Sequence, residues 1–169
     1  LYEKLFWDIV FRNNLTYGFI RSNDPDRDPP YNELFLLGGA NSMRGYNWFS
    51  IAKRKFSNKV YNDSLAALGP DRARIRAMRP FGGTQQLFYQ AEFEFPLISE
   101  AGIKGVVFYD IGNADDVLSA TEFRSDVGFG FRWFSPIGPL RFEWGFPLER
   151  KPELEEPAVV FQFAIGSPF

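Results

Sequence analysis

The chain has 169 residues, enough for one ordinary domain, and its formal net charge of −2 points to no nucleic-acid partner. It contains no cysteine and no histidine. This composition excludes disulfides, thiolate metal sites and histidine-based catalysis or metal binding. We therefore expect no enzymatic activity, no metal and no cofactor.

Aromatic residues make up 18% of the chain, with 20 Phe, 7 Tyr and 4 Trp. The mean hydropathy is nevertheless slightly negative, and no run of about 18 apolar residues occurs that could form a transmembrane helix. Many aromatics with middling hydropathy suit the wall of a membrane barrel, where one face meets lipid and the other a polar lumen. Because no signal peptide opens the chain, we expect a processed or truncated N-terminus.

The first predicted strand spans residues 4–21, where apolar residues such as Trp7 and Phe11 alternate with charged residues such as Asp8 and Arg12. Successive residues of a strand point to opposite faces of its sheet. The alternation therefore predicts one apolar and one polar face.

The stretch from residue 22 to residue 83 lacks this alternation and is rich in arginine and lysine. A connection of this length in a compact domain is normally functional or disordered. Residues 64–78 could form a short helix within it. The segment Gly38–Tyr46 contains paired glycines, which permit a sharp turn, followed by a single arginine, Arg44, among small residues.

Five further strands are predicted over residues 84–96, 101–113, 122–135, 139–149 and 158–169. Their polar face carries glycines and charges of both signs, which suits a wet lumen filled by side chains. Their apolar face is aromatic on every strand, and no second amphipathic layer is available to cover it, so lipid is the expected cover. A soluble β-sandwich and a soluble ligand-binding barrel are the alternatives.

The predicted connections also differ in kind. Residues 135–139 form a tight turn of proline and glycine, and residues 98–102 could form another, as expected on a periplasmic side. Residues 114–121 and 150–157 are longer and polar, which suits the outer side.

Arg44 could fold back into the lumen and find a carboxylate there. A buried arginine needs a partner, and Asp110 lies on the polar face by the period of two. Alternatively, Arg44 is a solvated loop residue and Asp110 pairs with Arg132 or Lys104.

The polar face could also suggest the paired carboxylates of a glycosidase. Ion pairs that fill a lumen are the more ordinary explanation of its charged residues, which are Glu92, Glu94, Arg124, Asp126, Arg132, Arg141 and Glu143.

Three segments together resemble the BamA-type outer-membrane assembly-factor superfamily, which also includes TamA, the two-partner secretion transporters and chloroplast-envelope relatives. Met43-Arg44-Gly45-Tyr46 resembles its (V/I/M)-R-G-(F/Y) motif. Phe108 to Gly112 resembles its F-x-D-x-G strand motif, and the segment 128–140 resembles G-x-x-x-R/Q-W-x-S-P-x-G-P-L. The order and spacing match over nearly the whole chain.

The resemblance implies an all-β fold, an antiparallel transmembrane β-barrel of the bacterial outer membrane. Residues 1–169 would be the C-terminal portion of one barrel domain, the last six of about sixteen strands. Residues 22–83 would be the sixth loop, folded inward, and residues 84–169 the last five strands.

The resemblance also implies roles for single residues. The loop motif of Met43, Arg44, Gly45 and Tyr46 would dock inside the lumen through an Arg44–Asp110 pair. The lumen partners are Phe108, Asp110, Gly112 and Arg132, and Arg132 either joins this network or competes with Arg44 for Asp110.

The final segment resembles the β-signal of outer-membrane proteins, which alternates apolar residues and ends on an aromatic. Its residues are Phe161, Phe163, Ile165, Gly166 and Phe169. Pro168 departs from the signal because proline cannot donate a ladder hydrogen bond. In the superfamily the seam between the first and last strands is weak, and Gly166 and Pro168 would suit such a seam, although Pro168 could simply end the strand.

The predicted function is that of an insertase, which folds other barrel proteins and inserts them into the outer membrane. The expected partners are outer-membrane lipids, unfolded outer-membrane protein clients and periplasmic lipoprotein subunits. A two-partner secretion transporter and a passive porin-like channel are the alternatives. The number of upstream POTRA domains would separate the insertase from the secretion transporter. Because six strands do not close a roomy barrel, the rest would come from an N-terminal portion or, by self-association, from a second copy.

Overall fold

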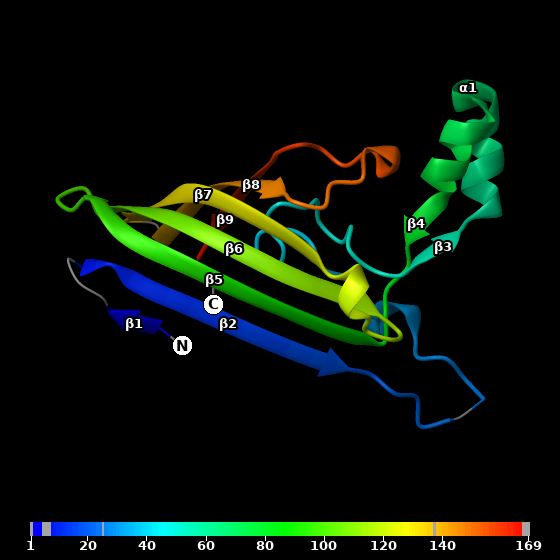
Figure 1. The fold of residues 1–169 in the computed structure, drawn as a ribbon, viewed down its shortest axis with the longest axis horizontal. Helices are drawn as coiled ribbons and strands as arrows, with labels where there is room; N and C mark the ends of the chain where they lie inside the picture. Colours follow the sequence, from blue (N-terminus) through cyan, green and yellow to red (C-terminus); the bar gives the residue numbers. More distant parts are fainter. Residues whose placement is uncertain (1, 5–7, 25, 137, 167–169) are drawn as a thin grey trace.

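The computed structural model of the chain describes residues 2–4, 8–24, 26–136 and 138–166. Its main feature is an antiparallel sheet of seven strands in the order β1-β2-β5-β6-β7-β8-β9 (Figure 1). The six strands β2 and β5–β9 lie where alternation predicts strands, and β1 is an additional short strand. The bounds are β1 (Tyr2–Lys4), β2 (Val10–Phe19), β5 (Gln85–Ile98), β6 (Ile103–Asp115), β7 (Arg124–Ser135), β8 (Gly138–Pro147) and β9 (Val160–Ile165).

The first predicted strand, residues 4–21, is wrong at its N-terminal end. β2 begins at Val10, and Lys4 belongs to β1, which pairs antiparallel with β2 so that Lys4 lies opposite Val10. Asp8 has a φ of 60°, a left-handed conformation that does not continue a strand. Alternation could not locate this reversal because apolar and polar residues continue to alternate through it. Residues 5–7 of the prediction lie outside the described residues.

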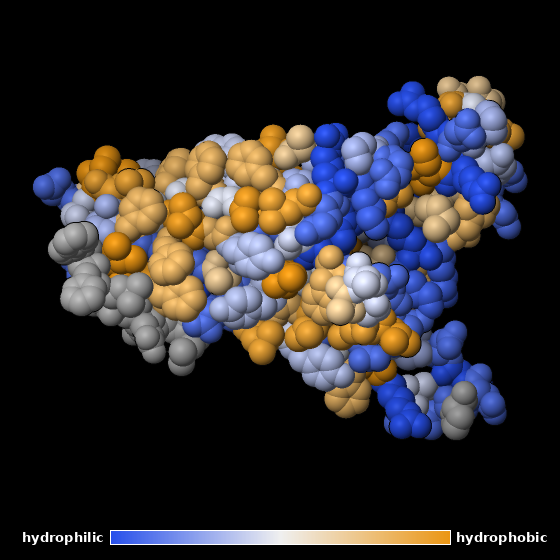
Figure 2. All heavy atoms as spheres, in the orientation of Figure 1, coloured by the Kyte–Doolittle hydropathy of each residue, from blue (hydrophilic) through white to orange (hydrophobic). Residues whose placement is uncertain are grey.

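The two faces of the sheet differ in polarity, as the alternation predicts. Along β5, Glu92 and Glu94 are buried on the inner face, whereas Phe93 is 44% exposed on the outer face. Figure 2 shows the hydrophobic residues gathered over the strands and hydrophilic residues over the loops at one end. Aromatic rings pair across neighbouring strands, as in Phe131 and Phe142, whose ring centroids lie 4.8 Å apart. Such pairs stabilise the sheet while leaving its outer face apolar.

The connections at the two ends of the strands differ in length, as predicted. At one end, β5 and β6 are joined by the short turn of residues 99–102, and β8 begins three residues after β7 ends. At the other end, the connections comprise residues 20–84, 116–123 and 148–159 (Figure 1). Short turns on one side and long loops on the other are typical of outer-membrane barrels, in which the loops face the exterior.

The connection between β2 and β5 contains its own secondary structure. Its elements are the short helix η2 (Tyr31–Glu33) and the pair of strands β3 (Arg54–Phe56) and β4 (Met78–Pro80), between which lies α1 (Asn58–Ala77). The predicted helix over residues 64–78 thus forms but starts earlier, where the Ser57 hydroxyl accepts a hydrogen bond from the Val60 N–H. α1 is kinked at Gly69, whose φ is 75°. No helix in the described part of the chain is both long and apolar enough to cross a membrane.

The connection divides into two segments that occupy different places. Residues 54–80, the projecting segment, extend away from the sheet, and residues 34–53, the docked segment, lie behind it (Figure 1). The apolar core of the described residues lies between the docked segment and the inner face of the sheet. Its buried members are Leu37, Met43, Tyr46, Ile51, Phe88 and Ala114.

Candidate functional site

The docked segment makes a tight turn around the predicted loop motif. Gly38 and Gly39 have φ values of 111° and 98°, and the Gly39 N–H is shared between the carbonyls of Met43 and Tyr46, at 3.0 and 3.1 Å. A Cβ at Gly38 would lie 2.2 Å from the Asn47 carbonyl oxygen, so the turn admits no side chain there. The paired glycines therefore permit the sharp turn that the sequence predicts.

Arg44 enters the space enclosed by the sheet and meets Asp110 of β6. The Arg44 Nε and Nη2 atoms donate to the two carboxylate oxygens of Asp110 at 2.8 and 2.7 Å, and the Arg44 backbone N–H donates to the same group at 3.1 Å. Both side chains are fully buried. The guanidinium also stacks 3.7 Å from the ring centroid of Phe108. The predicted Arg44–Asp110 pair is thus present, and it is bidentate.

Two further carboxylates share Arg44. Its Nη1 atom donates to Glu92 of β5 at 2.9 Å and to Glu143 of β8 at 3.5 Å. Arg44 therefore bridges three strands of the sheet. Sequence reasoning placed both glutamates on the inner face but did not assign them to Arg44. Alternation gives the face on which a strand residue lies, but not the position along the strands at which a loop side chain meets that face.

Arg132 of β7 joins this network without competing for Asp110. It donates to Glu92 at 2.7 Å, to Glu94 at 3.0 Å and to Glu143 at 3.1 Å. Of the two possibilities raised by the sequence, the structure shows that Arg132 joins the network and does not compete with Arg44 for Asp110. The glutamates that could suggest a glycosidase each face an arginine, which favours ionised groups held in place over a free acid and base.

The other motif residues are also held against strands. Met43 is fully buried in the core, and the Tyr46 hydroxyl donates to the Ser125 carbonyl at 3.0 Å. A Cβ at Gly45 would lie 2.4 Å from the Cβ of Asp126. Only glycine therefore lets the backbone between Arg44 and Tyr46 approach β7 this closely.

Glycines on the strands make room for strand side chains that face inward and, at Gly145, for the docked segment itself. A Cβ at Gly128 would lie 2.2 Å from the Phe108 ring, and one at Gly112 would lie 2.6 Å from the Phe88 Cβ. A Cβ at Gly145 of β8 would lie 2.5 Å from the Gly45 nitrogen. Sequence reasoning singled out Gly112 but missed the part that Gly145 plays, although a small residue at an inward position was a signal for close backbone approach.

Polar side chains from three strands bind the backbone of the docked segment, and sequence reasoning missed them too. Gln90 of β5 donates to the Ser42 carbonyl at 2.9 Å, and Arg141 of β8 donates to the Ala40 carbonyl at 3.3 Å. Gln162 of β9 donates to the carbonyls of Arg44 and Tyr46, each at 3.2 Å. These contacts satisfy loop carbonyls that are buried away from water.

The predicted C-terminal signal lies on the outer face. Phe161, Phe163 and Ile165 are 52%, 50% and 65% exposed. Phe163 packs against Phe142 of β8 with 5.2 Å between ring centroids. Gly166 ends the strand with a φ of 110°. Pro168 and Phe169, the last part of this prediction, lie outside the described residues.

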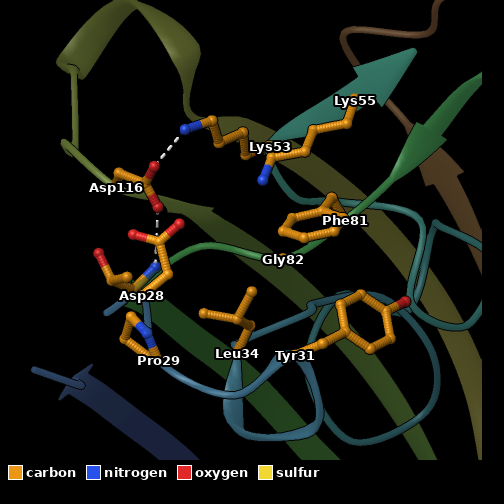
Figure 3. A pocket seen from close by; sticks show the side chains of 10 residues that line it. Asp28, Pro29, Tyr31, Leu34, Lys53, Lys55, Phe81, Gly82 and Asp116 are labelled. Atoms are coloured by element: carbon orange, nitrogen blue, oxygen red, sulfur yellow. Dashed lines mark hydrogen bonds and ion pairs between the residues drawn. The ribbon is translucent and has the colours of Figure 1, made fainter. Parts of the chain in front are cut away.

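The docked segment is also tied down near its C-terminal end, beside a pocket of about 320 Å³ (Figure 3). Lys53 forms an ion pair with Asp116, whose carboxylate also accepts a hydrogen bond from the Thr84 N–H at 3.3 Å. The hydrogen bond between them lowers the pKa of Asp116 and raises the pKa of Lys53. Among the residues that the structure describes, no group of three or more metal-ligating side chains is placed to hold a metal ion.

Comparison with known proteins identifies the family. Residues 1–169, the whole chain, match the Omp85 superfamily domain. The chain belongs to the Omp85 superfamily. Within this superfamily, it is 32% identical over 174 residues to the outer membrane protein assembly factor BamA of Nitratidesulfovibrio vulgaris, a match that covers 99% of this chain and 19% of that protein. It is 27% identical over 157 residues to BamA of Neisseria meningitidis serogroup B, which covers 85% of this chain and 19% of the relative.

A solved structure shares the fold of this Omp85 chain. The crystal structure of BamA from Haemophilus ducreyi lacking POTRA domains 1–3 matches with a TM-score of 0.61 and 18% identity, over 92% of this chain and 34% of that one. The predicted resemblance and the antiparallel barrel fold are thereby confirmed, and the location is the bacterial outer membrane. The chain spans about a fifth of the length of the curated relatives.

Proposed function

We propose that this Omp85 chain carries the seam of an insertase, which folds β-barrel proteins and inserts them into the outer membrane without a cofactor or an enzymatic step. The observation that carries the proposal is the length of β9. Within the described residues it pairs with β8 through six residue pairs, followed by one hydrogen bond from the Gly166 N–H to the Pro139 carbonyl, whereas the ladders between β2 and β8 contain ten or thirteen pairs. A strand this short offers an equally short ladder to any strand on its other side. The seam there would be weak, and an open strand edge templates pairing with another strand.

The environment of β9 supports the same role. Its outward residues are aromatic or aliphatic and exposed, which suits a lipid surface across which a client strand could arrive. Its inward side faces the docked segment. The partners that we propose are unfolded outer-membrane protein clients, outer-membrane lipids and periplasmic lipoprotein subunits, in keeping with relatives that are named assembly factors.

The docked segment favours an insertase over a passive channel. It occupies the inner face through a buried network of Arg44, so a porin-like pore would have to form around it or after its release. A secretion transporter of the same superfamily would also need this segment to leave when a client passes. A large and stable conductance of the intact protein would contradict the proposal.

Cysteine cross-linking can test whether clients pair with β9. The chain has no cysteine of its own, so Phe163→Cys adds a unique thiol in this region of the full-length protein, with any cysteine elsewhere replaced. The matched control is Phe93→Cys on the central strand β5, where the side chain has similar exposure, 44% against 50%. We expect a client with a cysteine in its last strand to cross-link to position 163 and not to position 93. Equal yields at both positions would refute the proposal.

A further inference from the structure

We propose that Gln162 is a positioning residue that ties β9 to the docked segment and so holds the last strand at the edge of the sheet. Gln162 is 4% exposed and points inward from the middle of β9. Its Nε2 atom donates to the carbonyl oxygens of Arg44 and Tyr46, each at 3.2 Å. Among the described residues, both hydrogen bonds between the docked segment and β9 come from this one side chain.

The chemistry of this contact requires a donor at position 162. Both partners are backbone carbonyls, which only accept, so the amide nitrogen and not the amide oxygen must face them. The two acceptors lie on either side of Gly45, whose backbone rests on Gly145 of β8. Because neither glycine has a side chain, the loop backbone lies close enough to the sheet for a glutamine on the next strand to reach it.

The tie matters because the docked segment is anchored elsewhere. Arg44 is bound to Glu92 of β5, Asp110 of β6 and Glu143 of β8, so the loop carbonyls that Gln162 binds are fixed relative to the central strands. In the described part of the chain, β9 itself pairs with β8 through six residue pairs and one further backbone hydrogen bond, from Gly166 to Pro139. If β9 moves away from β8, the two carbonyls lose their donor in a buried site, which is costly. The docked loop thus opposes the opening of the edge.

Hydrogen exchange of the full-length protein in lipid nanodiscs tests this tie. In Gln162→Leu we expect the backbone amides of residues 160–165 to exchange about tenfold faster, as the loss of about one to two buried hydrogen bonds predicts. Gln162→Glu keeps the shape but cannot donate when ionised, and we expect it to behave in the same way. Gln162→Asn is one methylene shorter and provides a milder variant that should change exchange in the same direction.

Gln90→Leu is the matched control. Gln90 is also buried and also donates to a carbonyl of the docked segment, that of Ser42, but it belongs to the central strand β5. We expect this variant to speed exchange in residues 40–46 and to leave residues 160–165 unchanged. Equal acceleration of β9 in both variants, or no acceleration in any Gln162 variant, would overturn the proposal.

The inference rests on the proposed function only in treating β9 as one side of a seam. The exchange measurement needs no client, so it reports on the tie even if cross-linking to clients fails. Conversely, cross-linking at position 163 with unchanged exchange in the Gln162 variants would leave the insertase in place and remove the tie.

Discussion

The two segments of the long loop differ both in charge and in position: the docked segment has two basic residues and no acidic one, and it lies against the sheet. The docked segment buries Arg44 completely among three carboxylates. The projecting segment carries seven basic and two acidic residues, and most of its charged side chains, such as Lys59 and Arg72, are exposed. The number of charges therefore does not mark a functional loop. What distinguishes the docked segment is that carboxylates on the inner face of the strands bind its arginine, Arg44.

The two ends of the projecting segment lie close together, which lets the docked and projecting segments belong to one loop. The Phe81 N–H donates to the Lys53 carbonyl at 2.8 Å, so the chain leaves and returns at nearly the same point. The projecting segment is thus an excursion from the docked one. Changes in the docked segment should therefore destabilise the protein more than changes in the projecting segment.

Removing the Arg44 side chain should cause the largest loss of stability. Arg44→Ala leaves Asp110, Glu92 and Glu143 buried near one another with less positive charge, and we expect a loss of about 3–5 kcal/mol in the free energy of unfolding. Urea unfolding of the full-length protein measures the loss, and protease cleavage within residues 34–53 reports release of the loop. Arg72→Ala in the projecting segment is the control and should change stability by less than about 0.5 kcal/mol.

The Arg44–Asp110 contact itself can be isolated by a double-mutant cycle. Because the pair is bidentate and buried, the losses of Arg44→Ala and Asp110→Ala should fail to add by at least about 1 kcal/mol. Strictly additive losses would show that the two side chains do not stabilise each other directly.

A side chain at Gly145 should displace the loop without removing any charge. In Gly145→Ala the new Cβ would lie 2.5–2.6 Å from the backbone of Arg44 and Gly45, which cannot yield as a side chain could. We expect a loss of about 1–3 kcal/mol and faster proteolysis of residues 34–53. Unchanged proteolysis would mean that the loop backbone does not rest on β8.

The ion pair between Lys53 and Asp116 should matter less and depend on pH. Its side chains are 37% and 41% exposed, so Asp116→Asn should cost only about 0.5 kcal/mol at pH 7. Because the folded protein lowers the pKa of Asp116, this contribution is present above the ordinary aspartate pKa and is lost as the pH falls through the lowered value. The difference between the two proteins in unfolding titrations should therefore shrink as the pH falls through the lowered pKa of Asp116, and a difference that does not shrink in acid would contradict the assignment.

Excising the projecting segment should have the smallest effect. Replacing residues 54–80 with a short glycine-serine link joins two points that are already hydrogen bonded. We expect proteolysis of residues 34–53 and the stability to change little, by less than about 1 kcal/mol. Release of the docked segment in this variant would show that the two segments act as one unit.

Most of the sheet could be predicted from the sequence because its outer and inner environments differ along every strand. Alternation placed Glu92, Asp110 and Arg132 on the inner face, and the motif around Arg44 identified the loop residue that reaches the two carboxylates. It could not show that the chain reverses between Lys4 and Val10, because apolar and polar residues continue to alternate through that stretch of the sequence.

The sequence by itself determined which residues face inward, which face outward and which loop carries the motif. Only the tertiary structure decided the partners: that Arg132 binds glutamates and not Asp110, that Gly145 supports the loop, and that Gln162 binds its carbonyls. The physical reason is that polar and apolar residues alternate along each strand and so can be recognised in the sequence. Contacts between side chains depend instead on the strand register and on where along the strands the loop meets the inner face. Those are set by pairing between residues as far apart as Arg44 and Gln162.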